Sequence, residues 1–221
     1  MQKPVLIVSL LLISAILCSQ TEKKLVILHT NDLHSRLTGY APESAYTPLT
    51  INDDKTVGGF ARISSIIKDE RSKNDGITLV IDGGDFLMGT LFHHLEPSTG
   101  FQLPLMKEMG YDAACLGNHE FDFGPEKLAD IINRSLLRGE IPYLLLGNAV
   151  FDNDDPADDA LEELFRREVI SRRMIIEKDG LRIGLFSVFG KVAVHDAPYA
   201  VPVTFERKIE SCQEAGKGAE K

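Results

Sequence analysis

The chain has 221 residues, of which 43% are hydrophobic and 26% charged, and its formal net charge is -9. This length is enough for one domain with its own core or for part of a larger protein, and the composition excludes a disordered chain. The acidic balance argues against a nucleic-acid polymer as partner, because phosphate backbones are held by clustered Lys and Arg side chains.

The first twenty residues have the pattern of an export signal. Lys3 is followed by a run over residues 4–17 that is apolar on every face and too short for a comfortable membrane span. The run ends at Cys18, which is either the lipidated cysteine of a lipoprotein or a residue near an ordinary cleavage site. Both alternatives stay open, because Leu17 is a poor match to the small residue that usually precedes a lipidated cysteine. We expect a signal peptide over residues 1–20 and an exported protein, in the periplasm or at the cell surface, with membrane attachment only through a lipid on Cys18.

Short apolar runs alternate with helical patterns along the rest of the chain. Four runs have the length and composition of buried strands: residues 25–30, 78–81, 112–116 and 141–146. Three segments have helical periodicity or helix-end signals: residues from 60 onward, 101–109 and 125–137. Strands that alternate with helices predict an α/β fold, with a largely parallel sheet covered by helices on both faces.

The second half of the chain carries two more local signals. Asp179-Gly180 lies between the apolar residues 174–178 and 181–189, which predicts a β-hairpin. The aspartates over residues 152–159 lack the glycine and terminal glutamate of an EF-hand loop, so a solvated loop is favoured over a calcium site. A loop and a helix are further expected over residues 39–56 and 205–214.

Polar side chains suited to metal binding follow three of the predicted strands. Asp32 and His34 come after the first strand, Asp85 after the second, and Asn118-His119 after the third. The carboxyl ends of parallel strands lie at one edge of a sheet, so we expect these side chains to converge there. Carboxylate, imidazole and amide groups together suit Zn, Mn, Fe or Mg. An aspartate after a strand is often only a turn former, and it is the repetition of the pattern at three strand ends that favours a metal site.

Such a site suits the hydrolysis of phosphate esters. Two metal ions about 3.5–4 Å apart neutralise the phosphate charge and generate hydroxide at neutral pH. A histidine that binds no metal is then able to protonate the leaving group. Asp122 lies three residues after His119 and is suited to hold its imidazole in one tautomer.

Five runs of residues carry a resemblance to a known family: residues 28–34, 58–62, 81–85, 110–113 and 116–124. Together they resemble the calcineurin-like metallophosphoesterases, and more narrowly the branch of 5′-nucleotidases, UDP-sugar hydrolases and 2′,3′-cyclic phosphodiesterases. The resemblance extends over about residues 25–205 and implies a metallophosphoesterase-type α/β sandwich with largely parallel sheets flanked by helices. It also implies two divalent metal ions, a nucleotide or other phosphate ester as substrate, and a place in nucleotide catabolism.

The resemblance assigns a role to each residue of the three motifs. Asp32 and His34 are implied to bind one metal ion, and Asp85 to bridge both ions. Asn118 is implied to bind the second ion. His119 is implied to be catalytic, paired with Asp122.

The family completes its site with later histidine motifs and adds a C-terminal nucleotide-binding domain, neither of which this sequence contains. We therefore interpret residues 21–221 as the N-terminal part of a metallophosphoesterase catalytic domain, apparently truncated, with the C-terminal domain absent. The alternative to a working phosphoesterase is a catalytically weak or inactive remnant with a partial metal site. We expect the remaining histidines to take no part in the chemistry, and only His195 among them is placed near the rim of the site. Cys115 is expected to be a core residue and not a nucleophile.

The expected signal peptide predicts a processed N-terminus. Mass spectrometry of the mature protein should find residues 1–17 or slightly more removed, with a lipid adduct on residue 18 if that cysteine is acylated. An intact N-terminus on protein recovered from the cytoplasm would contradict the expectation of export.

Overall fold

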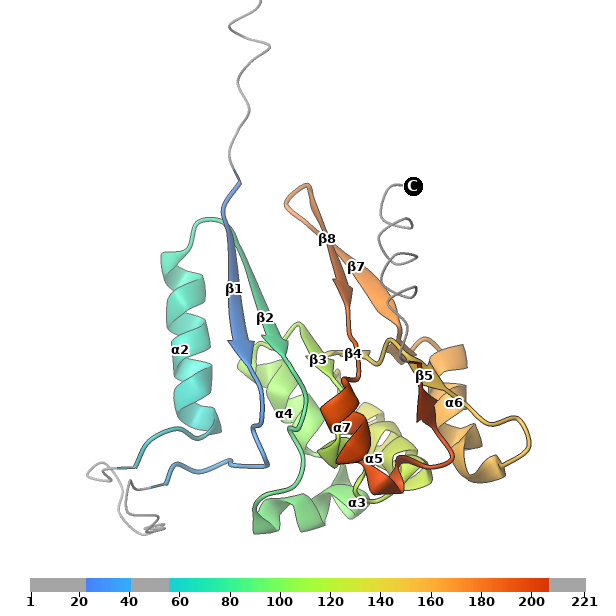
Figure 1. Ribbon diagram of the computed structural model, residues 1–221. Coiled ribbons are helices and arrows are strands. Elements are labelled where there is room, and N and C mark those ends of the chain that lie inside the picture. Colours follow the sequence, from blue (N-terminus) through green and yellow to red (C-terminus); the bar gives the residue numbers. More distant parts are fainter. Residues whose placement is uncertain (1–22, 41–55, 207–221) are drawn as a thin grey trace, which may run out of the picture.

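The computed structural model describes residues 23–40 and 56–206 (Figure 1). The expected signal peptide, most of the loop expected over residues 39–56 and most of the helix expected over residues 205–214 lie outside the described residues.

A five-stranded parallel sheet forms the centre of the molecule. Its strands are β1 (Leu25–Thr30), β2 (Ile77–Asp82), β3 (Ala113–Cys115), β4 (Tyr143–Leu145) and β6 (Ile170–Ser171), in the order β1-β2-β3-β4-β6. All neighbouring pairs are parallel, so every strand ends at the same edge, which faces the lower part of Figure 1. The predicted α/β fold with a largely parallel sheet is confirmed, and β6 is a strand that the sequence did not indicate.

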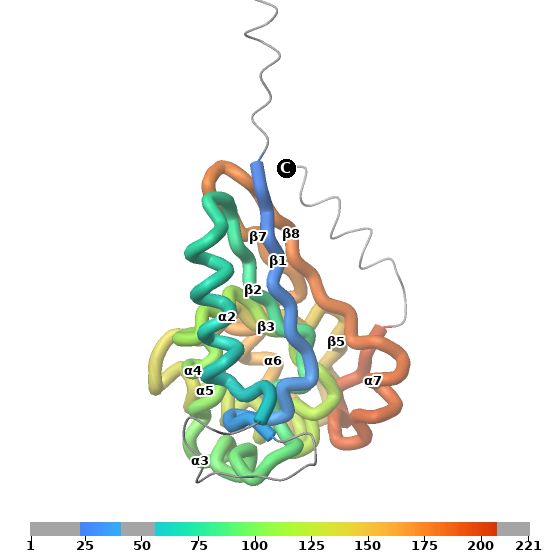
Figure 2. The backbone as a smooth tube through the Cα atoms, turned by 90° about the vertical axis from the view of Figure 1, so that its left-hand side faces the viewer, coloured from blue at the N-terminus to red at the C-terminus, as the bar shows by residue number. Residues whose placement is uncertain are grey.

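The main helices form one row. They are α2 (Phe60–Lys73), α4 (Gln102–Met109), α5 (Pro125–Arg138) and α6 (Asp159–Arg166), and each contacts the next along the row. The strands follow one another across the sheet in chain order, and right-handed crossovers then place every connecting helix on the same face. Figure 2 shows α2 on one side of β1 and β2, and β8 (Leu181–Phe186) on the other. Helices on both faces were expected, whereas these four helices cover one.

Smaller elements complete the described chain. β8 pairs with β7 (Arg173–Lys178) in the predicted hairpin, where Asp179 and Gly180 form the turn with φ angles of 50° and 71°. β5 (Ala149–Val150) pairs with β9 (Thr204–Phe205). The short helices are η1 (Leu91–Leu95), α3 (Glu96–Thr99), η2 (His119–Phe121), η3 (Pro156–Asp158), α7 (Lys191–His195) and η4 (Pro198–Ala200).

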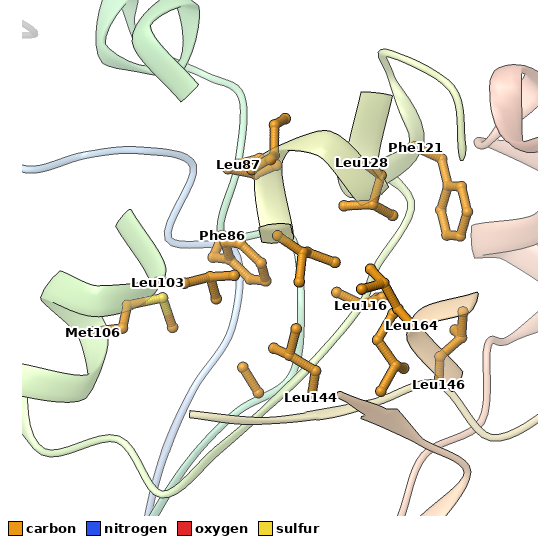
Figure 3. Close-up of a cluster of buried hydrophobic side chains, with 14 of the residues drawn as sticks. Phe86, Leu87, Leu103, Met106, Leu116, Phe121, Leu128, Leu144, Leu146 and Leu164 are labelled. Carbon is orange, nitrogen blue, oxygen red and sulfur yellow. The ribbon is translucent and has the colours of Figure 1, made fainter. Parts of the chain in front are cut away.

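The core lies between the sheet and this helical row. Leu116, directly after β3, and Leu144 of β4 point toward Leu128 of α5 and Leu164 of α6 (Figure 3), and each is at most 3% exposed. Burial of a leucine side chain contributes about 1.5–3 kcal/mol. Phe121 is fully buried at the edge of this cluster and makes an edge-to-face contact with Phe189 at 5.8 Å between ring centroids. The core therefore also fixes the turn that carries His119.

Two local expectations need correction. The aspartate-rich segment is not a plain solvated loop, because it runs through η3 into α6 and its Asp158 is fully buried, accepting the N–H of Asp152 at 3.0 Å. The helical spacing of Phe60, Ile63, Ile66 and Ile67 predicts one apolar face for α2, but Ile66 is 60% exposed, whereas Phe60 and Ile67 are buried.

Buried Glu96 makes the stability of the fold depend on pH. Its side chain accepts one N–H, from Gln102 at 3.0 Å, and burial raises the pKa of its carboxyl to about 7. The folded state therefore holds a proton that the unfolded chain releases at lower pH, so stability falls as the pH rises from about 4.5 to 7.

Replacing Glu96 by Gln should remove this dependence, because the amide oxygen can accept the same N–H without a charge. Urea unfolding at pH 5 to 8 should show the variant gaining stability relative to the wild type as the pH rises, by up to about 3 kcal/mol. Unfolding free energies that stay parallel across this range would show that the Glu96 carboxyl is not protonated in the fold.

Candidate metal centre

The three loops that follow β1, β2 and β3 meet at the carboxyl edge of the sheet. The first loop runs alongside the second, with hydrogen bonds from the N–H of Asp32 to the Gly84 carbonyl and from the N–H of His34 to the Asp85 carbonyl, each 3.0 Å. The third loop joins them through the N–H of His119, which donates to Oδ1 of Asp85 at 2.9 Å. The structure thus brings all three sequence motifs to one place.

Three of the four predicted metal ligands have a left-handed backbone. Their φ angles are 55° at Asp32, 48° at His34 and 58° at Asp85. This conformation costs a residue other than glycine about 1–3 kcal/mol, and it persists only where the surrounding structure enforces it. Here it is enforced by the hydrogen bonds between the first two loops, and it turns the side chains out of the strand pattern toward the edge.

The donor groups suit a divalent cation in their chemistry. Asp32 Oδ1 lies 3.5 Å from His34 Nε2, and the carboxylate of Asp32 is 54% exposed. Asn118, half-buried at the start of η2, adds an amide oxygen. Carboxylate, imidazole and amide ligands fit Zn, Mn, Fe or Mg. Within residues 23–40 and 56–206, however, no group of three His, Cys, Asp or Glu side chains is already arranged to hold an ion.

His119 and Asp122 form a pair beside these donors. Nδ1 of His119 is 2.7 Å from Oδ2 of Asp122, and the His119 ring lies 5.0 Å from the ring of His34 between centroids. Burial lowers the pKa of His119, but the hydrogen bond to Asp122 and the charges of nearby carboxylates outweigh it, so the pKa is raised. Asp122 also fixes the tautomer, because it accepts at Nδ1 and leaves Nε2 for other partners.

Two glycines allow the second and third loops to touch. A Cβ atom on Gly117 would lie 2.3 Å from Oδ1 of Asp85, and one on Gly84 would lie 2.8 Å from the nitrogen of Gly117. Both distances are shorter than any real Cβ contact. A side chain at either position would therefore push the two loops apart.

Two buried carboxylates of this edge were not singled out from the sequence. Glu120 is fully buried and accepts three main-chain N–H groups; burial raises the pKa of its carboxyl, and these hydrogen bonds act against that rise by favouring the ionised form. Asp82, at the end of β2, accepts the hydroxyl of Thr30 at 2.5 Å and the N–H of Gly84 at 3.0 Å, and burial raises its pKa to about 7. A sequence signal for these two carboxylates was available: the main-chain N–H groups of the glycine-rich loops need hydrogen-bond acceptors.

The other histidines and Cys115 lie apart from these contacts. His29 and His94 are exposed, and His93 packs its ring against Phe123 at 6.0 Å between centroids. His195 is 88% exposed and bonds to Asp196. Cys115 is half-buried rather than fully in the core, and burial raises the pKa of its thiol to about 11, so it is not a ready nucleophile.

Comparison with known proteins places the fold in a family. Residues 25–167 match the model of the calcineurin-like phosphoesterases. The chain belongs to this family. The match covers the sheet from β1 to β4 and all three loops of the candidate metal centre.

Several of the proteins to which the chain is similar are nucleotidases. The chain is 39% identical to the 5′-nucleotidase of Bos taurus over 107 residues, which are 48% of this chain and 18% of that protein. It is 35% identical to Protein 5NUC of Lutzomyia longipalpis over 166 residues, 73% of this chain and 26% of that protein. A 5′-nucleotidase precursor from Thermus thermophilus superposes with a TM-score of 0.65 and 26% identity, covering 88% of this chain and 34% of that one.

The NAD nucleotidase of Haemophilus influenzae has the same fold, with a TM-score of 0.63 and 24% identity over 88% of this chain and 31% of that one. This chain therefore spans about a fifth to a third of the length of these relatives. None of its described helices is long and apolar enough to cross a membrane.

Proposed function

We propose that the chain is a metal-dependent phosphoesterase of the 5′-nucleotidase type, which hydrolyses phosphate esters of nucleotides. The observation that carries the proposal is the position of the His119–Asp122 pair, whose imidazole lies 5.0 Å from that of His34 at the edge where all three motif loops meet. The names of the similar proteins, which include nucleotidases from mammals and bacteria, support the substrate class.

In this proposal Asp32, His34, Asp85 and Asn118 would hold the divalent ions. When bound, the ions supply positive charge that neutralises the phosphate and lowers the pKa of water. Zn, Mn, Mg and Fe all suit these donors. The protein contributes the geometry, because the N–H of His119 donates a hydrogen bond to Oδ1 of Asp85 and orients that carboxylate.

His119 acts on the leaving group. Hydroxide attacks phosphorus, the bond from phosphorus to the ester oxygen breaks, and that oxygen takes a proton from Nε2 of His119. Asp122 accepts the hydrogen bond at Nδ1 and stabilises the imidazolium, which agrees with the raised pKa of His119.

The alternative function is a catalytically weak or inactive protein with a partial metal site. It is favoured by one observation, that the described residues contain no group of three His, Cys, Asp or Glu side chains set up for an ion. Weak retention of the ions removes charge stabilisation worth several kcal/mol, and each 1.36 kcal/mol is a factor of ten in rate.

We further propose a role for the N-terminal segment and a domain assignment for the rest of the chain. Residues 1–20 act as a signal peptide that directs export, with lipid attachment at Cys18 or simple cleavage nearby. Residues from 21 onward belong to the metallophosphoesterase catalytic domain. The N-terminal mass spectrometry described above tests the first part.

The purified 221-residue chain should hydrolyse a 5′-nucleotide or a chromogenic phosphate ester slowly, far below one of its longer relatives, and only when a divalent ion such as Mn or Zn is added. His119→Ala should lower this rate by about 10²–10⁴-fold because the leaving group loses its proton donor. His195→Ala is the matched control, since that exposed imidazole bonds to Asp196, outside the motif loops, and its loss should change nothing.

Hydrolysis that survives both chelation and His119→Ala would refute the proposed mechanism. The complete absence of metal-dependent hydrolysis would favour the alternative, an inactive protein.

A further inference from the structure

We propose that Glu120 is a positioning residue of the metal centre: its carboxylate sets the distance between the loop that presents Asp85 and the loop that presents Asn118 and His119. The inference rests on the proposed function in that it takes these residues as ligands and acid. It assigns Glu120 no contact with metal or substrate.

One oxygen of Glu120 links the two loops directly. Oε2 accepts the N–H of Asp85 at 2.9 Å and the N–H of Gly117 at 2.6 Å. Oε1 accepts the N–H of Leu87 at 3.0 Å, two residues further along the second loop. The side chain is 0% exposed, so water cannot take its place as acceptor. Three main-chain donors outside any strand are thereby satisfied by one carboxylate.

The connection is reciprocal. Asp85 donates its N–H to Glu120, and its side-chain Oδ1 accepts the N–H of His119, the residue immediately before Glu120. Each loop thus supplies one carboxylate to the other, and the second loop donates two N–H groups to Glu120 while the third donates one to Asp85. Moving Glu120 would release the backbone of Asp85 and, with it, the orientation of the Asp85 carboxylate toward an ion.

The arrangement requires a carboxylate. Two oxygens that both accept are needed for three donors, and a glutamine offers one oxygen and an NH2 group that would face an N–H. Glu120→Gln should therefore break at least one of the three bonds while keeping the size of the side chain. Glu120→Asp keeps both oxygens but is one methylene shorter, so it should restore part of the connection.

Amide hydrogen exchange on the full chain without metal tests the connection itself. The N–H groups of Asp85, Leu87 and Gly117 should be protected in the wild type although they lie in loops, and should lose that protection by about tenfold or more in Glu120→Gln. Amides of the core helix α5 should not change. Asp158→Asn, which alters an equally buried carboxylate that accepts the N–H of Asp152 outside the motif loops, should leave the three amides protected.

Mn²⁺ alone, followed by paramagnetic broadening of amide signals, tests the consequence for the ion. Glu120→Gln should weaken Mn²⁺ binding by about 10–100-fold, the usual effect of removing a group that orients metal ligands, and Glu120→Asp should bind with intermediate affinity. Fast exchange of the three amides in the wild type, unchanged exchange in a folded Glu120→Gln variant, or wild-type Mn²⁺ affinity in that variant would each overturn the proposal.

A failure of the Glu120→Gln variant to fold and a failure of the wild type to bind Mn²⁺ can each be distinguished from a failure of this proposal. If Glu120→Gln does not fold by far-UV circular dichroism, exchange in the wild type and in Glu120→Asp decides. If the wild type binds no Mn²⁺, the proposed function fails, whereas the exchange data still decide whether Glu120 holds the two loops.

Discussion

The close contact between the loops after β2 and β3 is the constraint on which the site depends. Side-by-side pairing of these strands is short, with only Ile81 opposite Ala113 and Asp82 opposite Ala114. Beyond it, the loops are held by main-chain N–H groups that bond to carboxylates across the gap, and by glycines that leave room for this approach. A site built from separate loops needs such a connection, because an error of about 1 Å in the position of catalytic groups costs roughly a hundredfold in rate.

The hydrophobic core holds the loop after β3 in the position that this contact requires. Phe121 lies in the same short helix as His119 and is fully buried, so packing of its ring against Phe189 and Phe205 holds the turn that carries His119 in place. On the other side, Asp82 bonds to Thr30 and to the N–H of Gly84, tying the ends of β1 and β2 to the start of the second loop. Packing thus fixes the turn, and buried hydrogen bonds fix the loops relative to it.

Sequence patterns are sufficient to predict the sheet and the position of the motifs. The apolar run over residues 25–30 has the bounds of β1, and Pro125 and Gly139 lie at the two ends of α5. They do not predict β6, since two residues carry no periodicity, or the position of the four main helices on one face, since that follows from strand order. The burial of Glu120 and Asp158 is not predictable from the sequence, because an acidic residue in a loop is usually solvated. Only the fold shows that these carboxylates accept hydrogen bonds from main-chain N–H groups.

The proposed metal centre requires Asp32, His34, Asp85 and Asn118 to share divalent ions at one edge of the sheet. Anomalous diffraction from crystals of the chain soaked in Mn²⁺ tests it most directly, because the peak locates the ion without reference to activity. We expect a peak within about 2.0–2.6 Å of donor atoms from the first and second loops and next to Asn118 of the third loop. Peaks confined to other acidic groups, such as the aspartates of residues 152–159, with none beside Asp85, would contradict it.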